Sequence, residues 1–404
     1  MMDYTDPTSQ LSLEEGEPCQ GTATSGARLR VALFSGNYNY TRDGANRALN
    51  TLVAHLLAIG AKVRVYSPTT DRPAFEAEGE VISVPSLALP RRSEFRLALG
   101  LPADIRTDIR NFQPNIVHLS APDWLGWSAQ RFAKALRVPT VASMHTRFET
   151  YLRYYGLGIL ERAAVALQRR FYKACDRVLA PNEPCRSHLK SMGVPADRIL
   201  LWGRGVDTQL FSPCKRDLLF RRGLGFADRD TVVVFLGRLV REKGIDCFSR
   251  AIDELRGRGH VLRPLIVGDG PELAPMRARL PDTVFLGHLE GAALSRAVAS
   301  ADILLNPSTT EAFGNVNLEA MAAGLLVVSA DAPSAAALIK HHRNGFLCAA
   351  DPICFADQIE GIMRDRFRGA VIRQRAITTA RARSWPVTLE SVVRTYSSLL
   401  DETR

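Results

Sequence analysis

The chain has 404 residues, of which 46% are hydrophobic and 23% charged, and its formal net charge is +10. This length predicts two domains, each able to bury its own core, and the composition is that of a soluble globular protein. The positive charge permits three kinds of partner: nucleic acid, an anionic membrane surface or phosphorylated compounds. The sequence contains no recognised nucleic-acid-binding motif, so nucleic acid is not an expected partner.

Cysteine usage and the lack of long apolar runs bear on where the protein works. The seven cysteines are scattered and include no C-x-x-C pair, which argues for a reducing compartment and against a structural zinc site. No run of about 18 apolar residues occurs, and the N-terminus lacks a signal-peptide pattern. We therefore expect a cytoplasmic protein, either free or peripheral on the inner face of the cell membrane. Residues 1–27 are polar and are predicted to be a disordered tail.

The first half of the chain alternates short apolar runs with helical patterns. Strands are predicted over residues 29–34, 62–67, 115–119, 139–143 and 177–180, and helices over 48–57 and 124–136. Such alternation indicates a parallel sheet with helices on both faces. We assign residues 28–208 to an N-terminal Rossmann-like domain.

The same alternation resumes after an irregular connection at residues 200–230. Strands are predicted over 231–236, 262–267, 284–286, 303–305 and 326–329, with helices between them. Residues 209–385 are assigned to a second Rossmann-like domain, and residues 386–404 to a final helix that packs back on the first. The predicted fold class is α/β, with two doubly wound domains facing each other across a cleft. Ligands are expected at the C-terminal ends of the strands.

The most informative stretch spans residues 305–324, where Glu311 and Glu319 stand on either side of a Phe-Gly-Asn turn. The turn is predicted to open a helix, with Asn315 as its N-cap and Gly324 just after its C-terminus. The free N–H groups of a first helical turn favour an anion. An acid on each side of an anion site suits a nucleotide sugar, which is anionic in the middle and rich in hydroxyl groups at both ends. The helix alone would equally fit a buried structural helix.

A second candidate phosphate site directly follows the strand at 231–236, in the segment Gly237–Gly244. Arg238 and Lys243 straddle a strand-to-helix turn and can both reach one diphosphate, although a solvated basic loop would have the same sequence. The next strand ends in a second glycine turn at 267–272, where backbone must approach something closely. Neither turn carries the dinucleotide or P-loop fingerprint, so a nicotinamide cofactor, a kinase and an ATPase are disfavoured.

Taken in order, these motifs resemble glycosyltransferase family 4, a family of retaining glycosyltransferases with the GT-B fold. The motifs are Gly-Arg-Leu-x-x-Glu-Lys-Gly at 237–244, Val-Gly-Asp-Gly-Pro-Glu at 267–272, Phe-Leu-Gly-His at 285–288 and Pro-Ser-x-x-Glu-Ala-Phe-Gly-Asn-Val-x-Leu-Glu-Ala-Met-Ala-x-Gly at 307–324. The segment at 143–156 is similar to the branch that contains bacterial glycolipid mannosyltransferases and sulfoquinovosyl diacylglycerol synthases. The resemblance covers most of the chain beyond the tail.

The resemblance implies a role for each matching residue. Arg238 and Lys243 neutralise the leaving diphosphate, and Glu311 holds hydroxyl groups of the donor sugar. Glu319 holds the ribose hydroxyls. His145 lies near the transferred sugar, although a histidine at a strand end is often structural. The remaining donor-binding positions are Gly44 and the amides of Phe313, Gly314 and Asn315 at the diphosphate, and His288 with Leu289 at the base. Many relatives have two adjacent glycines where this chain has Asp43-Gly44.

The implied reaction is front-face displacement with retention, in which the departing diphosphate helps to deprotonate the acceptor hydroxyl group. Charge develops on the leaving oxygen, so fixed cations and amides there lower the barrier most. We expect neither a metal nor a cofactor, because Arg238, Lys243 and the helix start can supply this stabilisation. The triplet Asp228-Arg229-Asp230 precedes a strand and is better interpreted as a turn than as a Mg²⁺ site.

The expected activity is transfer of a hexose from GDP-mannose or a UDP-hexose to a hydroxyl acceptor, with a membrane lipid or glycolipid favoured. Two segments of the N-terminal half, 87–99 and 168–171, mix apolar and basic residues. Either could lie on an anionic membrane surface or be an ordinary surface loop or helix. Three alternatives stay open: a soluble or polysaccharide-precursor acceptor, a nucleotide-sugar epimerase of the same fold, and a non-catalytic nucleotide-sugar binder.

Overall fold

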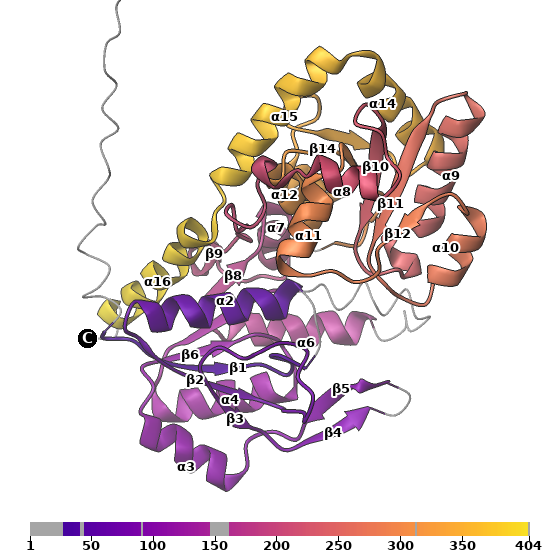
Figure 1. Ribbon diagram of the computed structural model, residues 1–404. Helices are drawn as coiled ribbons and strands as arrows, with labels where there is room; N and C mark the ends of the chain where they lie inside the picture. The colour runs from indigo at the N-terminus through magenta and orange to yellow at the C-terminus, as the bar shows by residue number, and fades with distance from the viewer. Residues whose placement is uncertain (1–26, 41–43, 90–91, 146–160, 312, 403–404) are drawn as a thin grey trace, which may run out of the picture.

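The computed structural model describes residues 27–40, 44–89, 92–145, 161–311 and 313–402. They form two parallel β-sheets, each flanked by helices, and a separate two-stranded hairpin (Figure 1). The predicted tail, apart from its last residue, lies outside the described residues. In both sheets the strands are short apolar runs, because helices cover both faces.

The N-terminal sheet has seven strands in the order β3-β2-β1-β6-β7-β8-β9, all parallel. The strands are β1 (Arg30–Phe34), β2 (Lys62–Ser67), β3 (Glu80–Ser83), β6 (Ile116–Leu119), β7 (Thr140–Ser143), β8 (Arg177–Ala180) and β9 (Ile199–Leu201). The helices between them are α2 (Gly44–Ala58), α3 (Ala103–Phe112), α4 (Trp124–Leu136), α6 (Glu161–Lys173) and α7 (Glu183–Ser191).

The C-terminal sheet has six parallel strands in the order β12-β11-β10-β13-β14-β15. The strands are β10 (Thr231–Leu236), β11 (Leu262–Val267), β12 (Val284–Phe285), β13 (Ile303–Asn306), β14 (Leu326–Ala330) and β15 (Phe346–Cys348). The helices are α8 (Leu218–Gly223), α9 (Ile245–Gly257), α10 (Leu273–Arg279), α11 (Gly291–Ala299), α12 (Asn315–Ala322), α13 (Pro333–Leu338), α14 (Pro352–Arg364) and α15 (Arg366–Arg381).

The last helix, α16 (Trp385–Glu402), packs on the N-terminal sheet next to α2 (Figure 1). Its buried residues share a core with α2 and with one face of that sheet, whereas α3, α4, α6 and α7 cover the other face. The chain passes between the domains twice, and the two crossings touch: the amide of Val206 donates to the carbonyl of Arg383 over 3.0 Å. A Cβ atom on Gly205 would lie 2.6 Å from the Cα of Trp385, so this contact requires glycine.

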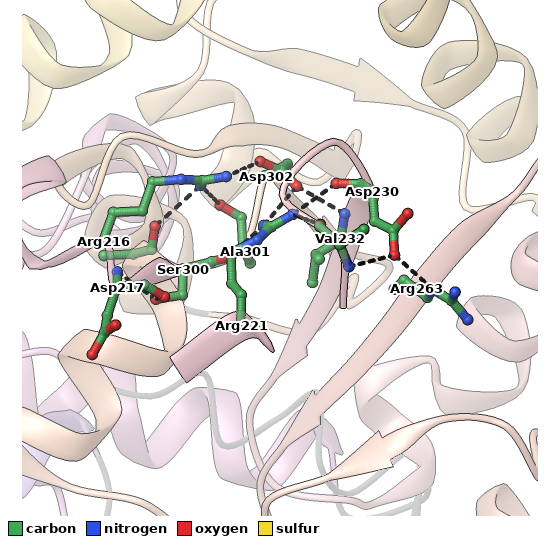
Figure 2. A network of polar contacts seen from close by, with 11 residues as sticks. Arg216, Asp217, Arg221, Asp230, Val232, Arg263, Ser300, Ala301 and Asp302 are labelled. Atoms are coloured by element: carbon green, nitrogen blue, oxygen red, sulfur yellow. Dashed lines mark hydrogen bonds and ion pairs between the residues drawn. The ribbon is translucent and has the colours of Figure 1, made fainter. Parts of the chain in front are cut away.

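An arginine–aspartate network fastens the connection before β10 to the C-terminal sheet (Figure 2). Arg221 is fully buried and donates to the carbonyl of Ser300 at 2.7 Å and to Asp302 at 3.1 Å. Asp302 also accepts from Arg216 at 2.7 Å and from the amide of Val232 at 2.8 Å. These contacts lie at the N-terminal ends of β10 and β13.

The Asp228-Arg229-Asp230 triplet adjoins this network. Asp228 pairs with Arg222, and Asp230 accepts from Arg263 at 2.9 Å and from the amide of Ala227. The predicted turn is therefore present, and each carboxylate is engaged by an arginine.

Several local expectations differ from the structure. The first helix begins at Gly44, not near residue 48, so Gly44 is a helix residue and not part of a loop. The segment 87–99, expected as a loop or helix, forms an antiparallel hairpin of β4 (Ser86–Leu89) and β5 (Arg92–Ala98) that projects from the domain (Figure 1). By contrast, Gly324 has a φ of +83° just after α12 and ends that helix as expected.

Candidate functional site

Loops meet at the C-terminal ends of β10 and β11, where ligands were expected. The loop after β10 contains Gly237–Gly244, and the loop after β11 contains Gly268 and Gly270. A Cβ atom on Gly268 would lie 1.9 Å from the carbonyl oxygen of Gly237, and one on Gly270 would lie 2.4 Å from that of Leu239. The close approach that the second glycine turn predicted is therefore to the first loop, which it holds in place.

Lys243 and Glu311 come from the loops after β10 and β13 and form an ion pair. The hydroxyl groups of Ser308 and Thr310 lie 3.4 and 3.3 Å from the carbonyl oxygen of Glu242, to which they donate. These bonds tie the two loops together on either side of the pair. The cation and the carboxylate predicted for diphosphate and sugar are thus neighbours.

Arg238 lies differently from Lys243. Its side chain is 63% exposed, and its guanidinium group is 4.0 Å from Glu242. In the same loop Arg241 is 87% exposed and pairs with Glu272 at 2.9 Å. The structure therefore leaves Arg238 extended into solvent, where a bound anion could recruit it.

The start of α12 differs from the prediction. Gly314, with a φ of +81°, is the residue before the helix, and Asn315 is the first helical residue and not the N-cap. The neighbouring amide of Asn317 is tied into the core, accepting from Asn306 at 2.9 Å and donating to Ser329 at 3.2 Å. Oδ1 of Asn315 is buried and has no hydrogen-bond partner in the described part of the chain. The first turn of α12 is therefore anchored to the core through Asn317, while the side-chain oxygen of Asn315 lacks a partner.

The N-termini of α2 and α12 face each other across the two domains. A Cβ atom on Gly44 would lie 2.5 Å from Nδ2 of Asn315, so the two helix starts are in contact. Each helix start carries partial positive charge, and the first turns of both helices, as described, contain no acidic residue. An anion placed there would be favoured by both helices.

Glu319 lies on α12, in the turn after this helix start. Burial raises the pKa of Glu319 to about 7, an effect that the charge of Arg47 on α2 partly offsets. A carboxylic acid with this pKa is poised between its neutral and ionised forms near neutral pH. Hydrogen bonds donated by a ligand would favour the ionised form, so binding can deprotonate Glu319 at a small cost in free energy.

His145 directly follows β7 and is held at both ring nitrogens. Nη2 of Arg204 donates to Nδ1 at 2.6 Å, and the hydroxyl group of Ser143 lies 2.7 Å from Nε2. Burial and the charge of Arg204 hold the pKa of His145 well below its usual range. A Cβ atom on Gly203 would lie 3.9 Å from the ring of Phe313, so this histidine cluster adjoins the loop that carries Glu311.

His288 and Leu289 follow β12. Leu289 packs against the C-terminal core, and His288 is half exposed, with Nε2 3.2 Å from Glu290. The segment connects to the glycine loops, because the amide of Gly268 donates to the carbonyl of Gly287 at 2.7 Å. The structure thus places the predicted base-contacting segment beside the loops at the end of β11.

Two residues at this site were missed by sequence reasoning, namely Arg204 and Arg47. Arg204 lies in the first domain crossing, where a Gly-Arg-Gly sequence interrupts the strand–helix rhythm, and this was the available signal. Arg47 is an unremarkable helix residue. In the part of the chain described here, no group of His, Cys, Asp and Glu is arranged to hold a metal ion. Nor is any described helix long and apolar enough to cross a membrane.

Comparison with known families assigns both halves of the chain. Residues 42–210 match the model for Glycosyltransferase Family 4, and residues 230–365 match that for Glycosyl transferases group 1. A GDP-mannose-dependent alpha-mannosyltransferase of Mycolicibacterium smegmatis is 32% identical over 92% of this chain and 98% of its own length. The sulfoquinovosyl transferase SQD2 of Arabidopsis thaliana is 31% identical over 78% of this chain and 62% of its own length.

Solved structures share the architecture. Anabaena HepE, in complex with UDP and glucose, has a TM-score of 0.71 and 20% identity over 92% of this chain and all of that chain. Sucrose-phosphate synthase of Thermosynechococcus elongatus has a TM-score of 0.74 and 18% identity over 92% of this chain and 99% of that chain. These likenesses confirm the predicted GT-B fold.

Proposed function

The chain belongs to glycosyltransferase family 4, and we propose that this hexosyltransferase moves mannose from GDP-mannose, or a hexose from a UDP-hexose, to a hydroxyl group of a membrane lipid or glycolipid, with retention. The assignment of the donor site rests on one observation: the starts of α2 and α12 meet at Gly44 and Asn315, beside the Lys243–Glu311 pair. This arrangement joins an anion site to a carboxylate that can accept sugar hydroxyls.

The chemistry follows from where negative charge develops. As the glycosidic bond breaks, charge builds on the diphosphate, and the two helix starts, Lys243 and a recruited Arg238 stabilise it. The diphosphate oxygen, on the same face as the acceptor, then takes the acceptor proton. Burial and the charge of Arg204 hold the pKa of His145 well below its usual range, so His145 orients the sugar and does not act as the base. Transfer should continue in excess EDTA; loss of transfer that Mg²⁺ restores would contradict this mechanism.

The assignment of a lipid acceptor draws on the relatives' names and on one face of the N-terminal domain. On the projecting hairpin Leu87 and Leu97 are directly opposed, and they are 60% and 48% exposed. Leu99, 53% exposed, lies on the same side of β5 as Leu97. Trp124, 63% exposed, adjoins them, because a Cβ atom on Gly100 would lie 3.4 Å from its indole nitrogen. These side chains form an exposed apolar strip.

A cavity of about 990 Å³ between α4 and α6 continues this strip. Its lining combines Trp124, Trp127 and Leu167 with four cationic side chains, Arg131, Lys134, Arg137 and Arg170, which outnumber the two acids, Asp123 and Asp176. No ion pair joins these four to an acid among the described residues. Apolar side chains beside unpaired cations suit a surface of anionic phospholipid, to which each cation adds about 1 kcal/mol.

The donor and acceptor are tested in sequence. A thermal-shift panel of UDP- and GDP-sugars identifies the donor, and product analysis with membrane lipid extract identifies the acceptor. A glycolipid product supports the proposal. Turnover of donor alone to an isomer would instead indicate an epimerase, and a product only with soluble glycans would move the acceptor assignment to that class.

Membrane association has its own test, co-sedimentation with vesicles of phosphatidylglycerol and phosphatidylcholine. Binding should weaken steeply as salt rises. It should weaken again when Leu87, Leu97 and Leu99 become serine. Leu219 of the C-terminal domain is more exposed than any of the three, and Leu219→Ser should bind as the unchanged protein does. Protein that stays in the supernatant at low salt would contradict the membrane assignment and leave the donor assignment intact.

A further inference from the structure

A chain of buried polar side chains runs from His145 to the C-terminal helix. The hydroxyl group of Ser143 lies 2.7 Å from Nε2 of His145 and 2.9 Å from Nε2 of His118. Nδ1 of His118 is 2.5 Å from the hydroxyl group of Tyr396, on α16. The proposed donor site uses His145 alone of these four, so the other three need a separate explanation.

Because these three side chains are buried, each polar group that lacks a hydrogen bond would reduce the stability of the fold. His118 and Tyr396 are completely buried, and Ser143 is 1% exposed. Burial lowers the pKa of His118 to about 3, so its imidazole is neutral throughout the working range. A buried polar group that loses its partner forfeits roughly 1–3 kcal/mol, so each bond constrains the next. The indole of Trp202 packs edge-on against both histidine rings and limits their rotation.

Arg204 determines where the proton of His145 lies. A guanidinium group can only donate, so Nδ1 of His145 must accept and the single ring proton must sit on Nε2. Nε2–H then donates to Ser143, whose own hydroxyl hydrogen points to the bare Nε2 of His118. The proton of His118 is consequently on Nδ1 and is donated to Tyr396.

We infer that Tyr396 and His118 are positioning residues, which act through Ser143 to hold the ring of His145 in the orientation and Nε2–H tautomer that its contact with Arg204 sets. In the free enzyme Arg204 occupies Nδ1, and a hydroxyl group of the donor sugar takes that place on binding. The C-terminal helix thereby orients a side chain of the active site. The inference rests on the proposed placement of the donor sugar beside His145.

The first test needs no substrate. Nitrogen-15 spectra of labelled histidine distinguish the two neutral tautomers, and His145→Gln identifies the signal. The unchanged protein should show a neutral Nε2–H tautomer for His145 from pH 6 to 8. Tyr396→Phe, which leaves His118 without its partner, should shift the Nε2 signal of His145 because the bond to Ser143 loosens, while Arg204 keeps the proton on Nε2.

Tyr66→Phe is the matched control. Tyr66 is also fully buried in the N-terminal domain, and its hydroxyl group donates to Asp108 at 2.8 Å, outside the chain of bonds. It should lower the melting temperature as Tyr396→Phe does, yet leave the His145 signal unmoved. Identical His145 signals in the two variants would overturn the inference, whatever the donor proves to be.

The second test uses turnover of GDP-mannose. Tyr396→Phe should lower kcat about tenfold with little change in the donor KM, and Tyr66→Phe should retain kcat. In a Ser143→Ala background Tyr396→Phe should have no further effect, because the connection is already broken. Additive losses in kcat would mean that Tyr396 acts independently of Ser143 and would overturn the inference. If neither GDP-mannose nor a UDP-hexose is turned over, the donor proposal fails, and the spectra still decide whether Tyr396 positions His145.

Discussion

The two ends of strand β10 both carry arginines, and the protein treats them in opposite ways. At the N-terminal end Arg221 is fully buried and bonded to Asp302 and to backbone carbonyls (Figure 2). At the C-terminal end the side chain of Arg238 is 63% exposed, and its guanidinium group is 4.0 Å from the carboxylate of Glu242. The first arginine is consumed by the fold, whereas the second is available to a ligand.

The number of arginines in a sequence therefore does not by itself locate a phosphate site. The guanidinium group of Arg221 is fully buried among carbonyl and carboxylate oxygens, where a phosphate cannot reach it. At the C-terminal end the helix starts, Lys243 and Arg238 leave donors open. Substitutions at the N-terminal end of β10 should therefore change stability, and those at its C-terminal end should change turnover.

Removing the buried arginine should affect stability and not chemistry. Arg221→Ala removes one of the two arginines that pair with Asp302 and leaves the carbonyl of Ser300 buried without its donor, which costs about 3 kcal/mol of unfolding free energy. Urea denaturation measures the loss. The neighbouring Arg222→Ala, which breaks a solvent-exposed pair with Asp228, should leave the midpoint nearly unchanged. Equal midpoints for the two variants would show that the network contributes nothing.

Removing either cation at the other end should reverse this pattern. Lys243→Ala and Arg238→Ala should each lower kcat about a hundredfold, the scale of one lost electrostatic stabiliser. Arg241→Ala is the control in the same loop, because its side chain is more exposed and already paired, and it should stay active. If Lys243→Ala and Arg238→Ala lose stability but keep their turnover, the diphosphate binds elsewhere.

Glu311→Gln tests the role of the carboxylate that pairs with Lys243. The carboxylate accepts sugar hydroxyls and pairs with Lys243, so the amide should lower transfer at least tenfold while nucleotide affinity, measured by calorimetry, largely survives. Normal turnover in this variant would remove Glu311 from the donor site.

The smallest effect concerns Glu319, whose pKa is raised to about 7 by burial. The native state keeps this proton between roughly pH 4.5 and 7 while the unfolded state has lost it, so the group costs stability as pH rises through that interval. Glu319→Gln should therefore have a free energy of unfolding at pH 8 that is larger than that of the unchanged protein by on the order of 1 kcal/mol, and the two values, measured by urea denaturation, should converge at pH 4. Nucleotide binding should release a proton near pH 7 in the unchanged protein alone.

Strands and helices of the two sheets could be predicted closely where the signal is local. The apolar runs at 62–67, 177–180, 231–236 and 262–267 match β2, β8, β10 and β11 residue for residue. The hairpin at 86–98 could not be predicted, because residues such as Leu, Ala, Arg and Glu favour helix and the strand pairing is set by tertiary context.

The site divides in the same way. Glu311 and Lys243 could be named from motifs, but their direct contact depends on two loops 68 residues apart in the chain. The contact between Arg204 and His145 joins two parts of the N-terminal domain and has no counterpart in local sequence. The N-cap assignment of Asn315 was wrong because Gly314, with its positive φ, supplies the turn instead.

The touching crossings at Val206 and Arg383 make the C-terminal domain an insertion within the N-terminal one. Its two ends leave and return side by side, so the covalent connection between the domains is confined to one place, while Gly44 and Asn315 touch at another. Because Gly205 lies against Trp385 at the crossings, a side chain at this glycine would push the two crossings apart. Such a substitution would displace α12 relative to α2 and so disturb the donor site without altering any residue in it.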